Sequence, residues 1–270
     1  MYAQLVYELA DGVATIVLNR PEKLNALDEE AYDELRDAFV RAGKEDAAGV
    51  VVLKGAGRAF CAGGDVDMAR TRLTDERAGR KHFFQRMLPV SDAIVALGKP
   101  VVFAVHGACV GGGAELCMFA DYVVADETAF FVFNGTATGG CSWWGAPQLL
   151  PLLVGFRKAE DIMYFSRRVP ADEAEQIGLI NRMVPQGELD AAVDGVCNQL
   201  LDLSEEGLRL TKSAFRATKQ LLLASMQSAA EENVALMGKG DLTGAFSAFR
   251  EGRQMTWRDL RPGFAPEQVS

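Results

Sequence analysis

The first half of the chain places short apolar runs between amphipathic segments. Residues 5–9 and 14–18 flank Asp11-Gly12, a pair typical of hairpin turns, and so predict two paired strands. Asp28 can cap a helix that continues to about Ala42, because its carboxylate can accept hydrogen bonds from the free amides at a helix start. Further strands are expected at residues 50–54, 101–105, 122–125 and 130–133.

Helical patterns separate these strands and then replace them. Residues 75–97 and 114–120 have helical patterns and lie between the expected strands, and this alternation favours an α/β fold with a mainly parallel sheet. After Trp143 the pattern becomes helical, at residues 149–153, 158–165, 172–177, 188–203, 205–237 and 242–253. We therefore divide the chain into a core, residues 1–200, and a C-terminal helical region, residues 201–270.

Composition narrows the classes of partner. The 270 residues are 49% hydrophobic and 24% charged, as in an ordinary globular protein. The net charge of −9 argues against binding to nucleic acid, which needs a basic surface. No apolar run approaches the ~20 residues of a membrane-spanning helix. The N-terminal residues lack the basic and apolar regions of a signal peptide, so we expect a cytoplasmic protein without a membrane partner.

The supply of histidine and cysteine limits metal and redox chemistry. The chain has five cysteines without a CxxC pair, which suits a reducing compartment. His82 and His106 are the two histidines, too few for a histidine-rich metal site, so no metal is expected. Glycine motifs of the nucleotide-binding type are absent, so nucleotide phosphates are not the expected ligand.

Two glycine-rich turns carry the candidate chemistry. Residues 105–116 (VHGACVGGGAEL) join an expected strand to an expected helix, and Gly112 there can present its backbone N–H to a ligand. Glu115 follows closely and could move a proton. Residues 59–65 (AFCAGGD) form the second turn, where Gly64 can present another N–H. Two such amides make a two-donor pocket for a thioester oxygen.

The order of these motifs along the chain resembles the crotonase superfamily, the enoyl-CoA hydratases and isomerases. The resemblance rests on NRP at 19–21, NAL at 25–27, FCAGGD at 60–65, KPV at 99–101, GGGAEL at 111–116, AD at 120–121, AEQIGLIN at 174–181 and residues 245–253. It implies a spiral of ββα units with a C-terminal helical region used for trimerisation. It also implies an acyl-CoA substrate, no separate cofactor because coenzyme A is part of that substrate, and a homotrimer or hexamer.

The resemblance assigns roles to particular residues. Gly64 and Gly112 would donate to the oxygen of a thioester enolate, and Glu115 would act as the acid or base. Two adjacent rings, Trp143 and Trp144, favour a flat pocket for a cyclic or bulky acyl group. The remaining expected substrate contacts are Lys23, Ala26, Ala62, Asp65, Gly135, Phe246 and Phe249. Phe246 and Phe249 belong to a segment that either covers the coenzyme or packs in the trimer.

One position departs from the hydratase pattern. The hydratases use a second glutamate, and the corresponding position here is Gly135. A single carboxylate can still shuttle a proton between two carbons, as a double-bond isomerase requires. A hydratase could instead use Glu115 alone, with Asn134, Thr138 or Ser142 orienting water. Glycine at this position also resembles the dihydroxynaphthoyl-CoA synthases, which usually lack the first glutamate.

The alternatives outside catalysis are a crotonase-fold protein that only binds acyl-CoA and an RNA-associated homologue, which the acidic charge disfavours.

Overall fold

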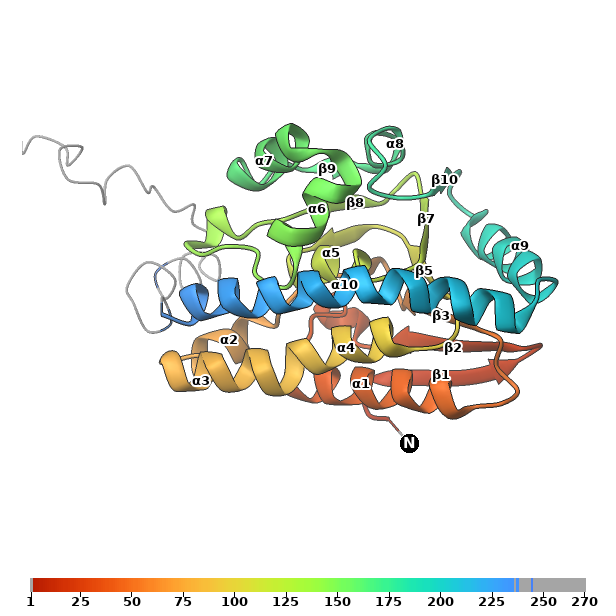
Figure 1. Cartoon of the computed structure of the whole chain (residues 1–270). Helices are drawn as coiled ribbons and strands as arrows, with labels where there is room; N and C mark the ends of the chain where they lie inside the picture. The colour runs from red at the N-terminus through yellow and green to blue at the C-terminus, as the bar shows by residue number, and fades with distance from the viewer. Residues whose placement is uncertain (1, 236, 238–243, 245–270) are drawn as a thin grey trace, which may run out of the picture.

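The computed structural model describes residues 2–235, 237 and 244 and contains two β-sheets surrounded by helices (Figure 1). In the larger sheet only the hairpin of β1 and β2 is antiparallel, and each other neighbouring pair is parallel. In order across this sheet, the strands are β1 (Leu5–Ala10), β2 (Val13–Leu18), β3 (Val50–Gly55), β5 (Val101–Val105), β7 (Tyr122–Asp126) and β10 (Arg182–Val184). The smaller sheet contains β4 (Ala59–Cys61), β6 (Ala108–Val110), β8 (Phe130–Val132) and β9 (Val169–Pro170).

Three consecutive strand pairs give the fold its repeat. In each of the pairs β3/β4, β5/β6 and β7/β8 the first strand joins the larger sheet and the second joins the smaller sheet. Each pair is followed by helical structure, which is the ββα spiral expected from the resemblance. The α-helices are α1 (Glu29–Lys44), α2 (Val66–Arg72), α3 (Glu76–His82), α4 (Leu88–Ala96), α5 (Gly112–Cys117), α6 (Ala146–Val154), α7 (Phe156–Tyr164), α8 (Ala171–Gln176), α9 (Leu189–Leu201) and α10 (Glu205–Val234).

The larger sheet is buried on both faces because its central strands carry apolar residues at successive positions. Val51 and Phe103 point into the main core, whereas Val50 and Val102 point into a second cluster on the other face. That cluster includes residues of α9, which covers this face of the sheet (Figure 1). Unbroken apolar strands are typical of parallel sheets that are covered on both faces.

The sequence located most long elements and missed short ones. Asp28 caps α1 by accepting from the Ala31 N–H at 3.0 Å, as expected. The predicted helix over 75–97 consists of α3, a π-helical turn at Phe83–Met87, and α4. Strands β4 and β6 and helix α2 were not expected, because three to seven residues give too little periodicity. The helix expected at 242–253 lies almost entirely outside the described residues.

A network of charged side chains, of which Lys212 is buried, attaches α10 to the core. Lys212 donates to the carboxylate of Asp121 at 2.6 Å and to the carbonyl of Lys99 at 2.7 Å. Lys219, two turns later, donates to the other Asp121 oxygen at 3.3 Å. The helix runs along the molecule and contacts α3, α4 and α6 (Figure 1). The boundary that we placed near residue 200 stays a prediction.

No helix in the described part of the chain is both long and apolar enough to span a bilayer.

Candidate active site

The two glycine-rich turns meet because their strands are neighbours. β4 and β6 pair in parallel, so the turns that follow them leave the same edge of the smaller sheet. A side-chain carbon on Gly63 would lie 2.6 Å from the carbonyl oxygen of Val110 and 3.1 Å from the nitrogen of Gly112. Gly63 also has a φ of 92°, which other residues rarely adopt. Only glycine therefore permits this close approach.

The amides of Gly64 and Gly112 are available to a ligand. Among the described residues, neither N–H has a hydrogen-bond acceptor in the chain. Gly112 is the first residue of α5, where the backbone N–H groups have no partner within the helix. A methyl group on Gly112 would lie 3.7 Å from the nitrogen of Gly64, so the two turns border one small space. Two donors arranged in this way can stabilise negative charge on an oxygen.

Glu115 lies next to these amides with its carboxylate buried. The side chain is on α5, and the residue is only 3% exposed. Its Oε1 atom accepts a hydrogen bond from the backbone N–H of Trp144 at 2.7 Å. Burial raises the pKa of Glu115 to about 8, and the Trp144 hydrogen bond opposes this only in part. A carboxyl group that titrates in this range can both accept and donate a proton near neutral pH.

A cavity of about 390 Å³ connects these groups. It brings together six of the expected site residues, which are Ala62, Gly64, Gly112, Glu115, Gly135 and Trp143. Glu115 is the one carboxylate among the described residues that line it. Within the described residues, no cluster of three or more histidine, cysteine, aspartate or glutamate side chains could hold a metal ion.

Three residues that were expected to contact the substrate instead bond to other residues of the chain. Asp65 caps α2 by accepting from its first amides, and it pairs with Arg20 at 3.2 Å. The carbonyl of Ala26 accepts from the same arginine at 2.8 Å. Lys23 is exposed and pairs with Asp67 at 3.3 Å. None of the three expected residues lines the cavity, so their contacts with a substrate stay predictions.

Trp144 is in the core instead of the cavity wall. Its ring is fully buried, and its indole N–H donates to the hydroxyl of Ser91 at 3.2 Å. The structure therefore gives this ring no place beside an acyl group, and its backbone N–H instead holds Glu115. Phe246 and Phe249 lie outside the described residues.

The position of the absent second glutamate is sterically closed. A side-chain carbon on Gly135 would lie 2.2 Å from the nitrogen of Ser142 and 2.4 Å from the carbonyl carbon of Cys141. Real side-chain carbons do not approach other atoms so closely. The loop after β8 folds onto itself at this point, so any side chain at position 135 would require the backbone to move.

Comparison with known proteins places this geometry in a family. The family model described as enoyl-CoA hydratase/isomerase matches residues 8–261. The chain belongs to the enoyl-CoA hydratase/isomerase family. A protein named probable enoyl-CoA hydratase EchA12, from Mycobacterium tuberculosis, is 35% identical over 205 residues, which are 74% of this chain and 72% of that protein.

Solved structures of the family have the same fold. A crystal structure of an enoyl-CoA hydratase from Mycobacterium avium subsp. paratuberculosis has a TM-score of 0.84, with 29% identity over 95% of this chain and 99% of that chain. A monofunctional enoyl-CoA isomerase from Mycobacterium smegmatis has a TM-score of 0.66, with 30% identity over 84% of this chain and 97% of that chain. The fold is thus the crotonase fold.

Several polar residues of the cavity wall were missed by sequence reasoning, Tyr32 and His82 among them. Tyr32 on α1 and His82 at the end of α3 line the cavity with Glu115. Tyr32 occupies the buried stripe of an amphipathic helix, where its spacing predicts only core packing. His82 could have been noticed as one of two histidines, but its position in a long helical pattern gave no sign of the cavity.

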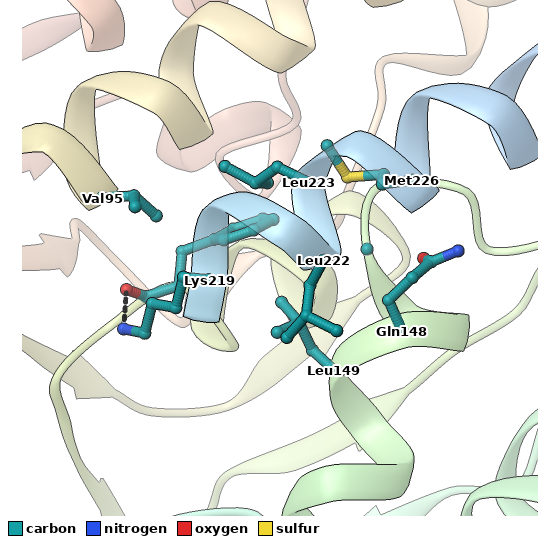
Figure 2. Close-up of a pocket in the computed structure, with 9 residues that line it drawn as sticks. Val95, Gln148, Leu149, Lys219, Leu222, Leu223 and Met226 are labelled. Atoms are coloured by element: carbon teal, nitrogen blue, oxygen red, sulfur yellow. Dashed lines mark hydrogen bonds between the residues drawn. The ribbon is translucent and has the colours of Figure 1, made fainter. Parts of the chain in front are cut away.

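A second hollow lies between α4, α6 and α10 (Figure 2). Val95, Leu149, Leu223 and Met226 form much of its wall, and Lys219 lies at its edge. The space is too narrow to admit a water molecule. It is therefore a packing gap along α10 and has no part in the candidate chemistry.

Proposed function

We propose that this protein catalyses proton transfer on an acyl-CoA thioester, with Glu115 as its acid and base. The observation that carries the proposal is the buried carboxyl group of Glu115 beside the two available amides of Gly64 and Gly112. A proton next to a thioester carbonyl is removed more easily when the oxygen of the resulting enolate accepts two fixed hydrogen bonds. The family membership of the chain supports a thioester as the substrate.

The first candidate reaction is migration of a double bond. The carboxylate of Glu115 would take a proton from the acyl chain, and the electron pair of that C–H bond would shift into a dienolate held by Gly64 and Gly112. Glu115, now protonated, would return the proton to a different carbon, and the electrons would return to a C=C bond. This sequence needs one carboxylate and no water, which agrees with the single carboxylate among the described residues of the cavity wall.

Hydration is the second candidate, and three side chains favour it. Asn134, Thr138 and Ser142 line the cavity and could orient a water molecule. Glu115 would take a proton from this water as its oxygen bonds to the β-carbon. The same carboxyl group would then protonate the α-carbon of the enolate.

We further propose that the acyl group is cyclic or bulky. Trp143 lines the cavity and lies against the ring of Phe83, with ring centroids 5.2 Å apart. A large planar side chain held by a second ring offers a flat apolar surface. Such a surface suits a ring or a branched chain better than a short linear one.

Self-association is the expected quaternary state. Large apolar side chains are exposed on α6, α7 and α10, at Leu152, Phe156, Tyr164, Phe215 and Leu221. Their exposure would cost free energy in an isolated chain, and contact with further copies would remove it. We expect a homotrimer or a hexamer, and sedimentation analysis of the full chain tests this expectation. A cytoplasmic location stays an expectation from the sequence.

The decisive experiment is incubation in heavy water with crotonoyl-CoA, a 3-enoyl-CoA and a cyclic dienoyl-CoA, followed by mass spectrometry. Deuterium incorporation or a moved double bond without added water is the expected result. Addition of a whole water would establish the hydratase reaction instead. Binding of all three thioesters without exchange or turnover would overturn the proposal in favour of a non-catalytic acyl-CoA-binding protein. Glu115→Gln is the matched control, and it should abolish both exchange and turnover.

A further inference from the structure

The cavity wall contains a histidine that lacks a hydrogen-bond partner. His82 is the last residue of α3, is 4% exposed and lines the same cavity as Glu115. Its Nδ1 atom is buried without a partner in the described structure. Buried polar atoms are nearly always paired, so the unpaired imidazole in this cavity wall can gain a hydrogen bond to a ligand once the ring turns to bring a nitrogen to the cavity.

His82 differs from the other unpaired groups in its location. Four described side chains contain a buried nitrogen or oxygen without a partner, namely those of Gln4, Tyr7, His82 and Gln148. Only His82 among these four lines the cavity that contains Glu115. Gln148 borders the narrow hollow of Figure 2, which no ligand can enter.

Tyr32 connects His82 to the two available amides. The ring of Tyr32 meets the imidazole edge-on, with centroids 5.1 Å apart. At its other end, the Tyr32 hydroxyl lies 3.5 Å from the position that a methyl group on Gly112 would occupy. His82 and the space beside Gly64 and Gly112 therefore both border the side chain of Tyr32.

The imidazole suits a neutral ligand group. Burial lowers the pKa of His82 to about 4, and the positive charge of Arg86 acts in the same direction. The ring is therefore neutral near neutral pH and offers one N–H donor and one nitrogen acceptor. The same cavity wall also contains apolar residues, among them Met68, Leu73, Met87 and Met237. His82 also directly precedes the π-helical turn Phe83–Met87, a feature that is frequent at functional sites.

We propose that His82 forms a hydrogen bond with a hydroxyl or carbonyl oxygen on the acyl chain, so that the cavity selects oxygenated acyl-CoA thioesters over unsubstituted ones. This inference rests on the proposed function, because it takes the cavity as the acyl site. It makes His82 a residue that determines specificity, while the proton transfer remains with Glu115. A chain without such an oxygen would leave the imidazole unpaired in the complex, which is the physical basis of the selection.

Calorimetry with saturated thioesters tests the inference without depending on turnover. The ligands are hexanoyl-CoA and the isomeric hydroxyhexanoyl-CoAs that carry one hydroxyl beyond the β-carbon. We expect the wild type to bind one hydroxylated isomer about tenfold tighter than hexanoyl-CoA, as one net hydrogen bond would give. His82→Phe and the smaller His82→Leu should remove this preference, and His82→Gln should restore part of it. His106→Gln is the matched control, because His106 bonds to the carbonyl of Gly57 at 2.9 Å and does not line the cavity.

A second measurement needs no change at His82. The chain contains two histidines, so isotope-labelled histidine gives two imidazole nitrogen patterns, which His106→Gln assigns. The His82 signals should shift with the hydroxylated thioester and much less with hexanoyl-CoA. Equal affinities for every isomer and hexanoyl-CoA, or equal shifts, would overturn the role of His82 and leave the proposed function intact. Failure of every acyl-CoA to bind would overturn both.

Discussion

The backbone N–H of Trp144 donates a 2.7 Å hydrogen bond to the buried carboxylate of Glu115. This contact joins the loop after β8 to helix α5, and it fixes the orientation of the one carboxyl group that the described part of the chain contributes to the cavity wall. Because it is a backbone donor, the bond would survive substitution of the Trp144 side chain wherever the loop keeps its course. One hydrogen bond compensates burial only in part, so the pKa of Glu115 stays raised, at about 8.

This raised pKa predicts the pH dependence of the reaction. If Glu115 first acts as a base, only its carboxylate form is active in the free enzyme. We therefore expect kcat/KM for double-bond migration to rise with pH and to level off above about 8. Initial rates measured across this range with a 3-enoyl-CoA would test it. A profile that falls through the same range would instead show that Glu115 reacts as a general acid.

The raised pKa of Glu115 also predicts that removing this carboxyl group stabilises the folded protein, relative to wild type, as the pH rises. Glu115 ionises near 4.5 in an unfolded chain and near 8 in the folded one, so the folded state binds the additional proton between these pH values. The protonated group therefore contributes its full stability below about 4.5, and this contribution is lost as the pH rises towards 8. Glu115→Gln lacks this loss, so its free energy of unfolding relative to wild type should increase by a few kcal/mol from about pH 5 to about pH 8.

Denaturant titrations of both proteins at several pH values would measure this difference. Glu173→Gln is a suitable comparison, because Glu173 is a salt-bridged carboxylate whose pKa is lowered by Arg167. Its replacement should remove stability at neutral pH instead of adding it. A Glu115→Gln protein with the same pH dependence as wild type would show that the carboxyl group is not buried in the folded state.

The role of the two amides predicts the effect of a single methyl group. Gly112→Ala would place that methyl 3.7 Å from the Gly64 nitrogen, in the space that a thioester oxygen would occupy. Its nearest neighbours lie at ordinary contact distances, so the protein should fold normally. Loss of one donor of this kind typically costs about 10²–10³ in kcat. Circular dichroism would test the normal folding of this variant, and steady-state kinetics would measure its loss of kcat. A near-native rate would rule out this position for the enolate oxygen.

Trp143 should control the choice of acyl chain. Trp143→Ala removes the ring that lies against Phe83 at the cavity wall. We expect kcat/KM for cyclic acyl-CoAs to fall by about tenfold or more, while short linear chains change little, because only the larger groups use the lost apolar surface. Ser91→Ala is a useful contrast, since it removes the partner of the buried Trp144 indole. That variant should affect stability more than acyl preference.

The sequence predicted what short motifs determine and missed what long-range packing determines. Gly64, Gly112 and Glu115, which the structure brings to one cavity, could be proposed from the sequence because a strand, a glycine turn and a helix start are local features, and their catalytic roles stay predictions. His82 was missed because the path of α3 past the cavity depends on its packing against other elements. Trp144 was assigned to the acyl pocket because neighbouring loop residues have no fixed periodicity, and only the folded loop separates its direction from that of Trp143.

The closed space around Gly135 predicts that a second glutamate cannot simply be restored. Gly135→Glu would place its first side-chain carbon 2.2 Å from the nitrogen of Ser142, so the loop must move. We expect a loss of roughly 1–3 kcal/mol or more in the free energy of unfolding, and no gain in hydration of crotonoyl-CoA. Gly195→Glu is the matched control, because a side-chain carbon there meets no atom within 4 Å and the backbone is not left-handed. A stable Gly135→Glu protein with raised hydratase activity would show that the loop opens readily and that the glycine alone determines the reaction.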